Sequence, residues 1–280
     1  QDEIAYEEYS IVPEGLVAHE LAHQWFGDLL TCKDWSHEWL NESFATYFDA
    51  AWVEKSRGKD EYDYEIYADM LTYFDEDKNR YRRPIVTNIY THPEDVGDRH
   101  LYEKGACILH FIRKGILGEA NFRRSLAHYV NTHAHTAVIT EDLMTSIRTA
   151  TGKNMTQFFE QWIYSAGHPE LRINVHYDSK AKKTIFRIAQ THAGDAYVVP
   201  VTVALTPKSG KILYEKKELT AKEHRWEFKT NGEPLNVVFD PENVILKNTN
   251  TTKPRKMWLH QLKKDPNAIQ RIYAAQELCK

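Results

Sequence analysis

The chain has 280 residues, of which 27% are charged and 42% belong to the nine apolar types, a composition typical of a folded globular protein. No stretch approaches the ~20 consecutive apolar residues that span a bilayer, which excludes a membrane-spanning segment in this sequence. The net charge of −4 disfavours a protein that binds nucleic acid.

The first 167 residues are predicted to be mainly helical. Apolar residues recur at helical spacing in seven segments: residues 15–31, 38–55, 61–74, 102–117, 122–130, 141–150 and 155–165. Thr140 is the expected N-cap of the sixth helix, and Gly152 is its expected C-cap. Residues 79–101 form a long irregular segment, and such loops in a compact domain are usually functional or disordered.

The pattern changes at Gly167. From there to about residue 250 the apolar period is two, and short runs rich in β-formers are separated by turn residues. The strand runs cover residues 171–177, 184–190, 197–205, 211–219, 225–230 and 235–240. Helical spacing returns over residues 253–280, and the chain ends inside that pattern. We therefore predict an α+β multidomain chain, with a mainly helical part (1–167), a small antiparallel β-sandwich (168–252) and the start of a helical domain (253–280).

The H-E-x-x-H segment at residues 19–23 carries the chemistry. His19 and His23 are four positions apart, so on a helix both imidazoles project from one face, and two nitrogens can bind one Zn²⁺ at about 2.0–2.1 Å. Glu20 lies beside the first histidine, where its carboxylate can accept a proton from an attacking water. Composition alone predicts roughly 0.06 such matches in this chain, so chance does not explain the motif.

A catalytic zinc site of this kind needs a third ligand, and Glu42 is the candidate. It lies in the next predicted helix, with 18 residues between it and His23. Requiring a glutamate at that offset lowers the chance expectation to about 0.005. Two histidines and one glutamate leave one coordination position open, which is typical of a catalytic rather than a structural zinc site.

Residues 17–48, VAHELAHQWFGDLLTCKDWSHEWLNESFATYF, resemble the zinc site of the gluzincin aminopeptidases, the alanyl/leucyl aminopeptidase family that includes leukotriene A4 hydrolase. In that family the glutamate of a W-L-N-E-G-F-A helix follows the H-E-x-x-H helix at this distance. Here Ser43 stands where the family has glycine. Thermolysin-type endopeptidases are less similar, because their third ligand lies one residue further away. The resemblance implies zinc held by His19, His23 and Glu42.

A second segment supports the same resemblance. Residues 102–106, YEKGA, are similar to the family's Y-x-K-G-A stretch, whose tyrosine hydroxyl stabilises the oxyanion of the tetrahedral intermediate. That role is implied for Tyr102. The resemblance further implies that residues 1–167 form a thermolysin-like catalytic domain that lacks its N-terminal part. The strand region then resembles the family's β-sandwich, and residues 253–280 the first helices of its C-terminal helical domain.

The implied function is a zinc-dependent aminopeptidase that acts on peptides with a free N-terminus, with Glu20 and Tyr102 as catalytic residues. The family's G-x-M-E-N segment, whose glutamate holds the substrate's amino group, is expected just upstream of residue 1. Specificity for the N-terminal residue is therefore inferred from the family and not from these residues. Two alternatives remain: a zinc endopeptidase or dual-function hydrolase of the same fold, and a catalytically weak binding scaffold.

Several other residues near the motif need interpretation. Asp28 and Glu38 flank the site, and either carboxylate is a candidate to orient a ligand imidazole. Five further histidines are expected at surface or core positions rather than at the metal: His37, His92, His100, His133 and His135.

Charge and cysteine usage add two expectations. Residues 1–100 carry 23 acidic and 9 basic side chains, whereas residues 101–280 carry 17 acidic and 27 basic ones. An acidic half can attract a free amine, but a solvated helix surface explains most of these carboxylates more simply. Cys32, Cys107 and Cys279 are far apart in the sequence, so we expect no disulfide and three small buried side chains.

Overall fold

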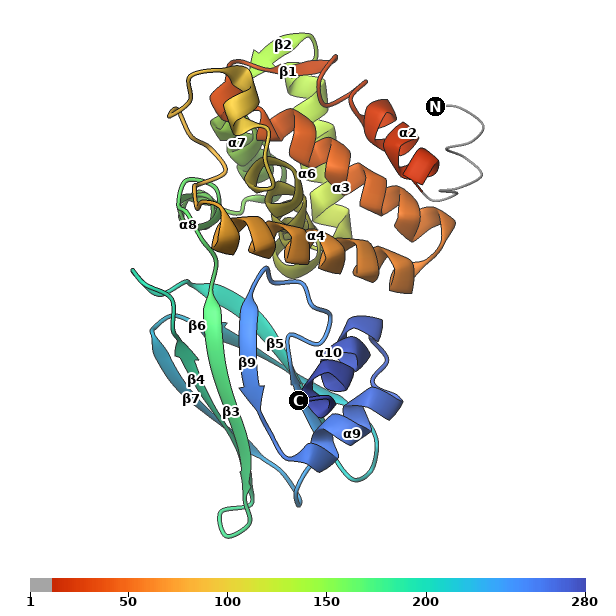
Figure 1. Cartoon of the computed structure of the whole chain (residues 1–280), viewed down its shortest axis with the longest axis vertical. Helices are drawn as coiled ribbons and strands as arrows, with labels where there is room; N and C mark the ends of the chain where they lie inside the picture. The colour runs from red at the N-terminus through yellow and green to blue at the C-terminus, as the bar shows by residue number, and fades with distance from the viewer. Residues whose placement is uncertain (1–11) are drawn as a thin grey trace. The chain divides into compact units, whose positions relative to one another are not determined.

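The change of apolar period at Gly167 marks a division of the structure. The computed structural model describes residues 12–280, and the chain separates into two units between Gly167 and His168 (Figure 1). The first unit is mainly helical, and the second contains two sheets and two helices. The predicted order, helices first and strands second, is confirmed at this level.

The helical unit has seven α-helices among the described residues: α2 (Val12–Ala22), α3 (Trp39–Ser56), α4 (Lys59–Asn79), α5 (Gly105–His110), α6 (Glu119–His133), α7 (Thr140–Thr151) and α8 (Thr156–Trp162). Two π-helical segments, η3 (His100–Lys104) and η4 (Phe111–Leu117), extend α5 at both ends. Two short 3-10 turns, η1 (Trp35–His37) and η2 (Pro93–Val96), lie in the connections.

An aromatic core fixes α3 in the middle of this unit. Phe44 is fully buried and stacks on Phe26 with ring centroids 4.3 Å apart, and the ring of Tyr129 of α6 has its centroid 6.4 Å from that of Phe44. Stacked aromatic pairs of this kind add to the stability that burial of their area supplies. Because α2 packs against α3 (Figure 1), the two helices that carry the predicted metal ligands rest on one rigid support.

The predicted helix over residues 15–31 is wrong beyond Ala22. The chain turns back after α2, where the backbone N–H of Asp28 donates to the carbonyl of His23 (2.9 Å). A Cβ on Gly27 would lie only 3.0 Å from that carbonyl, so the turn needs glycine. The chain then forms the three-residue strand β1 (Leu30–Cys32), which pairs in parallel with β2 (Thr136–Val138). Strands this short leave no alternating pattern to read.

The start of α7 also differs from the prediction. Its N-cap is Ile139, and Thr140 is the first helical residue. The Thr140 hydroxyl instead accepts a hydrogen bond from the Trp39 indole (2.9 Å) and lies 2.9 Å from Nδ1 of His37. At the other end, Gly152 is confirmed as the C-cap, with a φ of 75°.

The long loop before η3 is held by Asp98. The Asp98 carboxylate accepts two hydrogen bonds from Arg83 (2.6 and 2.7 Å) and one from the Tyr81 hydroxyl (2.7 Å). It also accepts the backbone N–H groups of His100 (2.9 Å) and Leu101 (3.0 Å). The segment predicted to be irregular is therefore tied to the start of η3, where Tyr102 lies.

The second unit contains two sheets. Its strands are β3 (Glu170–Asp178), β4 (Lys183–Gln190), β5 (Val199–Thr206), β6 (Leu213–Leu219), β7 (Glu223–Lys229), β8 (Asn236–Phe239) and β9 (Asn248–Thr252). One sheet has the order β7-β4-β3-β9 and the other β6-β5-β8. Trp226 of β7 stacks on Phe239 of β8 with centroids 6.4 Å apart, which joins the two sheets.

In the second unit, one strand and one pairing were not predicted. Strand β9 has the polar sequence NTNTT, which lacks the alternation of a half-buried strand, and it pairs in parallel with β3. The other strand pairs in these two sheets are antiparallel, for example Leu171 opposite Gln190 and Val203 opposite Phe239. The expectation of purely antiparallel sheets is therefore wrong at this edge.

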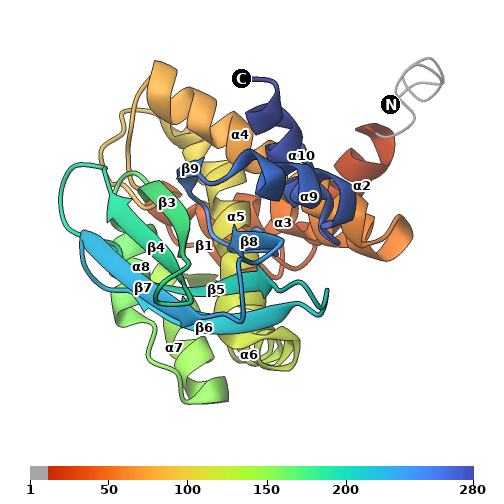
Figure 2. The ribbon, with the colours of Figure 1, turned by 90° about the horizontal axis from the view of Figure 1, so that it is seen from below.

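Two helices, α9 (Arg255–Lys264) and α10 (Ala268–Leu278), complete the second unit. They pack on each other, and α9 lies beside β8 (Figure 2). Before α9, the buried ammonium group of Lys253 donates to the Asn236 side chain (2.8 Å) and to the carbonyl of Val237 (2.7 Å). None of the described helices is long and apolar enough to cross a membrane.

The cysteines are all free, so the expected absence of a disulfide agrees with the geometry. Cys107 is buried and Cys32 is partly buried. Cys279 is exposed at the end of α10, so the expectation that it is a buried side chain is wrong.

Candidate metal centre

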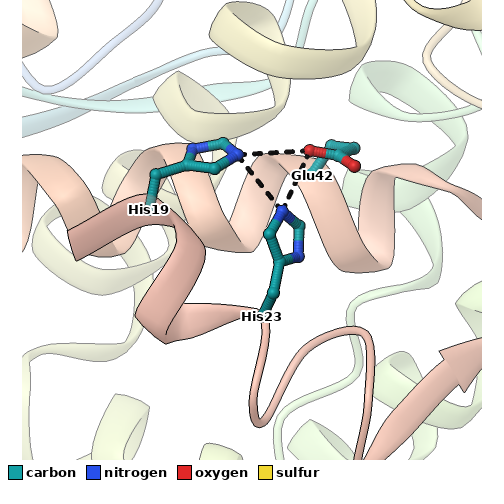
Figure 3. A group of neighbouring side chains, drawn as sticks. All are labelled: His19, His23 and Glu42. Atoms are coloured by element: carbon teal, nitrogen blue, oxygen red, sulfur yellow. Dashed lines mark hydrogen bonds and ion pairs between the residues drawn. The ribbon is translucent and has the colours of Figure 1, made fainter. Parts of the chain in front are cut away.

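Two packed helices bring three potential ligands together (Figure 3). His19 and His23 lie one turn apart on α2, and Glu42 lies in the first turn of α3. The two Nε2 atoms are 3.2 Å apart, and each lies 3.3 Å from Oε2 of Glu42. All three side chains are about one-fifth exposed, so the triangle is reachable from solvent.

The dimensions of this triangle suit a zinc ion. Four ligands at the usual zinc distances of about 2.0–2.1 Å in a tetrahedron have their donor atoms roughly 3.3–3.4 Å apart. The three edges here, 3.2 to 3.3 Å, match that spacing. Two imidazole nitrogens and one carboxylate oxygen are also a donor set that zinc prefers. The residues therefore fit the metal that the sequence predicts.

The three groups also perturb one another. The hydrogen bond to Glu42 raises the pKa of His23 to about 9, although burial acts in the opposite direction. Burial would raise the pKa of Glu42, but the hydrogen bonds with His19 and His23 outweigh it and lower that pKa to about 2. Without a metal, the cluster therefore holds a proton on His23 beside an ionised Glu42 at neutral pH.

The orientation of His23 comes from the backbone. Its Nδ1 atom lies 2.9 Å from the carbonyl oxygen of Phe26, which suits an Nδ1–H donor and leaves Nε2 free for a metal. Neither candidate carboxylate has this position. Asp28 accepts a hydrogen bond from the Gln24 side chain (2.9 Å). Burial, together with the charge of Glu42, raises the pKa of Glu38 to about 7.

Glu20, the predicted proton acceptor, is an exposed residue of α2. It lies on the same helix as the two histidines and next to His19 in the sequence. Its negative charge contributes to the raised pKa of His23. The structure therefore places its carboxylate in solvent near the triangle and not among the three ligands.

Tyr102, the predicted hydrogen-bond donor, lies at the same centre. Its ring is stacked near that of His19, with centroids 6.3 Å apart and an interplanar angle of 25°. Burial, and after it the charge of Glu42, raise the pKa of Tyr102 above its ordinary value. The phenol therefore keeps its proton at neutral pH and can donate a hydrogen bond.

The other histidines lie outside this triangle. His37 contacts Thr140, as described above. His100 is fully buried and, with Glu76 and Asp98, forms the second group of metal-type ligands among the described residues. In that group Arg83 already neutralises Asp98, and a second arginine pairs with Glu76 (2.8 Å). We therefore interpret it as a buried ion network. It also shows that part of the acidic half is paired and buried instead of forming a solvated surface.

The sequence left two contacts of the centre unpredicted. One is the carbonyl of Phe26, since a backbone acceptor has no signal of its own in the sequence. The other is Ser43, whose hydroxyl donates to the carbonyl of Leu101 (2.5 Å). The only available signal for Ser43 was its presence where the resembled family has glycine.

The chain is similar to known proteins. The family model described as "Peptidase family M1 domain" matches residues 4–162, which is more than half of the chain. A "Probable aminopeptidase 1" of Saccharolobus solfataricus is 32% identical over 206 residues, which cover 72% of this chain and 26% of that protein. The "Tricorn protease-interacting factor F2" of Thermoplasma volcanium is 32% identical over 201 residues, covering 70% of this chain and 25% of that protein.

A solved structure is similar in fold. The aminopeptidase A of Legionella pneumophila, crystallised with aspartic acid, aligns with a TM-score of 0.76 and 24% identity over 94% of this chain and 30% of that one. At this identity the similarity concerns the fold. The chain spans about a quarter of the length of the curated relatives that it matches.

Proposed function

The chain belongs to the peptidase M1 family, and from that premise we propose that it supplies the catalytic centre of a zinc-dependent aminopeptidase. Its substrates would be peptides with a free N-terminus, from which the first residue is removed by hydrolysis. The observation that carries the proposal is the triangle of His19, His23 and Glu42, whose edges of 3.2–3.3 Å suit one zinc ion. Curated relatives named as aminopeptidases support the reaction class.

Each residue of the centre has a role in this proposal. His19, His23 and Glu42 would hold the ion, which when bound would act as a Lewis acid for the scissile carbonyl and would lower the pKa of water toward ~7. Glu20 accepts the proton of the attacking water and delivers it to the leaving amine, for which its solvent-exposed carboxylate is suited.

Tyr102 acts on the other side of the reaction. Because its pKa is raised, its hydroxyl is protonated and donates a hydrogen bond to the carbonyl oxygen as negative charge develops there. One well-placed donor of this kind contributes roughly 3 kcal/mol to stabilising the transition state. The neutral carbonyl oxygen of the bound substrate carries less negative charge than the oxygen of the transition state, so the hydroxyl stabilises the transition state more strongly. Its effect is therefore expected in kcat.

The proposal extends to the organisation of the chain. We infer that residues 1–167 are the thermolysin-like catalytic domain, residues 168–252 the β-sandwich domain and residues 253–280 the first helices of a C-terminal helical domain. The division at Gly167 and the fold similarity to an aminopeptidase over most of the chain support this inference.

Two measurements test the function. The zinc-loaded protein is expected to cleave a leucyl or alanyl anilide and to leave the N-acetylated anilide intact, whereas cleavage of N-acetylated peptides would identify an endopeptidase. Elemental analysis should find one zinc per chain, and His23→Ala should lose it. His176→Ala, at an exposed histidine of β3, is the matched control and should keep its zinc. Retention of a full equivalent in His23→Ala would contradict the ligand assignment.

A further inference from the structure

A single side chain connects the two parts of the proposed centre. Ser43 directly follows Glu42 on α3, and Leu101 directly precedes Tyr102 on η3. The Ser43 hydroxyl donates a 2.5 Å hydrogen bond to the carbonyl oxygen of Leu101. Both residues are buried, so water does not compete for this bond. The bond therefore joins the neighbour of a proposed metal ligand to the neighbour of the proposed oxyanion donor.

The helices approach each other unusually closely at this point. A Cβ on Gly105 would lie 1.8 Å from Oγ of Ser43 and 2.5 Å from its Cβ, but 3.6 Å from its Cα. Gly105 is therefore required by the Ser43 side chain and not by the backbone of α3. With glycine at position 43, a methyl group at position 105 would have an ordinary contact. The two positions thus form a complementary pair across the helix interface.

From this geometry we propose that Ser43 is a positioning residue, which sets the distance between the Glu42 carboxylate and the Tyr102 hydroxyl through its bond to Leu101. The inference rests on the proposed function of the centre. Packing alone also holds α3 against η3, but a hydrogen bond fixes direction as well as distance.

The expected size of the effect follows from the geometry of catalysis. Tyr102 has to meet a carbonyl oxygen whose position depends on the ligands, one of which is Glu42. Displacement of a catalytic group by about 1 Å can cost up to 10²-fold in rate. Loss of one hydrogen bond in a packed interface allows a smaller shift, so an effect of about tenfold is expected. The effect should fall on kcat because Tyr102 acts in the transition state.

The first test is Ser43→Ala, which removes the hydroxyl and keeps the Cβ. In the zinc-loaded protein we expect kcat for an aminoacyl anilide to fall about tenfold, with KM within about twofold and one zinc per chain retained. Ser125→Ala is the matched control, because Ser125 is a buried serine of α6 that donates to the carbonyl of Asn121 (2.8 Å). Equal kcat values for the two variants would overturn the proposal.

A double-mutant cycle then identifies the partner. If Ser43 acts through Tyr102, Ser43→Ala should lower kcat no further once Tyr102→Phe has removed the hydroxyl. A full tenfold loss in the Tyr102→Phe background would show that Ser43 affects catalysis by another route, and it would overturn the proposal.

A readout independent of turnover uses 3-fluorotyrosine placed at position 102. Its ¹⁹F resonance in the zinc-loaded protein should shift or broaden in Ser43→Ala and remain unchanged in Ser125→Ala. An unchanged resonance in Ser43→Ala would contradict a positioning role. If the wild-type chain proved to have no peptidase activity, the proposed function would fail, but this measurement would still test whether Ser43 positions Tyr102.

Variants at positions 43 and 105 separate the effect of packing from the effect of the hydrogen bond. Gly105→Ala alone is expected to lower the midpoint of thermal unfolding, because the new Cβ collides with Ser43. Adding Ser43→Gly should restore the midpoint, since the nearest atom of α3 is then 3.6 Å from that Cβ. The double variant should nevertheless keep the tenfold loss of kcat, because the bond to Leu101 is still missing. Recovery of kcat together with the midpoint would overturn the proposal.

Discussion

The two glutamates of the centre differ in their surroundings although they lie on neighbouring helices. Glu42 is partly buried and bonded to two imidazoles, which keeps it ionised down to a pH of about 2. Glu20 is exposed, so its carboxylate can exchange protons with solvent. This difference suits Glu42 to hold a cation and Glu20 to move a proton.

Replacement of the proton acceptor should separate binding from chemistry. Glu20→Gln is expected to keep one zinc per chain and to lower kcat by 10²-fold or more, roughly the contribution of general base catalysis, because an amide cannot accept the proton. Tyr102→Phe should also keep the metal and lose about 10²-fold in kcat with little change in KM. Steady-state kinetics with parallel elemental analysis checks both, and an unchanged kcat would remove the residue concerned from the mechanism.

Zinc uptake should depend on pH through His23. Its pKa is raised to about 9 in the metal-free protein, so below that pH the proton on His23 must leave before its nitrogen can bind a metal. We expect uptake at pH 7.5 to release about one proton and the apparent affinity to rise about tenfold per pH unit up to pH ~9. Calorimetry in buffers of different ionisation enthalpy measures the release. Uptake without proton release would contradict this account.

At the residue scale, the sequence predicted which side chains form the centre better than it predicted the contacts that orient them. The spacing of His19, His23 and Glu42 is a property of helices, and the structure places the three donor atoms within 3.3 Å of one another. The carbonyl of Phe26 orients His23 because the turn at Gly27 brings it there. This contact depends on the turn at Gly27, whereas the sequence pattern predicted a continuous helix through residues 15–31.

At the scale of elements, the position of Tyr102 depends on the start of a helix. Asp98 caps the first N–H groups of η3 and is held in turn by Arg83. Burial would raise the pKa of Asp98, but the neighbouring His100 and Arg83 outweigh it and lower that pKa below its ordinary value. Asp98 therefore stabilises the fold above pH ~4, its usual pKa, and this stabilisation is lost as the pH falls toward the lower native value.

Asp98→Asn tests this account of the loop. It leaves the partly buried Arg83 without its counter-charge, so we expect the free energy of unfolding at pH 7 to fall by about 2–4 kcal/mol. The difference from wild type should shrink as the pH is lowered below about 4. Urea unfolding at pH 7, 4 and 2.5 measures it. Glu94→Gln, at an exposed position of the same loop, is the control and should change stability by less than about 0.5 kcal/mol. A difference that does not vary with pH would contradict the charge-based explanation.

Elements were predictable where their own residues carry the pattern. Long helices such as α3 and α6 have apolar faces of several turns, and strands β3 and β7 alternate clearly between more buried and exposed side chains. Strands β1, β2 and β9 show no such alternation and were not predicted. Their stability comes from pairing with a strand distant in the sequence. Likewise Thr140 begins α7 because of its contact with Trp39, which no local rule for caps includes.

At the scale of the whole chain, the described part of the helical unit has a large apolar hollow of about 1150 Å³. It lies along α2, α3 and α6, and its lining includes Val17, Leu21, Trp25 and Trp52, all of them strongly exposed. A surface of this kind is normally covered by another protein surface.

The 280-residue chain expressed alone is therefore expected to self-associate through this hollow. Trp52→Glu should shift the population toward monomer, because the 48% exposed indole contributes apolar area that a carboxylate does not. Leu213→Glu, at a 50% exposed leucine of β6, is the matched control and should leave association unchanged. Sedimentation velocity over a range of concentrations measures both, and equal behaviour of the two variants would show that the hollow does not mediate association.

The triangle at the metal centre also bears on which ion the protein carries. Its three donor atoms come from two helices, and the packing of α2 against α3 brings them together. A rigid site of imidazole and carboxylate donors accepts several divalent metals, with affinities that rise from manganese to copper in the Irving–Williams order. The geometry of the site therefore sets the number of protein ligands, but it does not exclude divalent metals that bind these donors more tightly than zinc. The identity of the resident ion then depends on which metals the surrounding medium supplies when the chain folds.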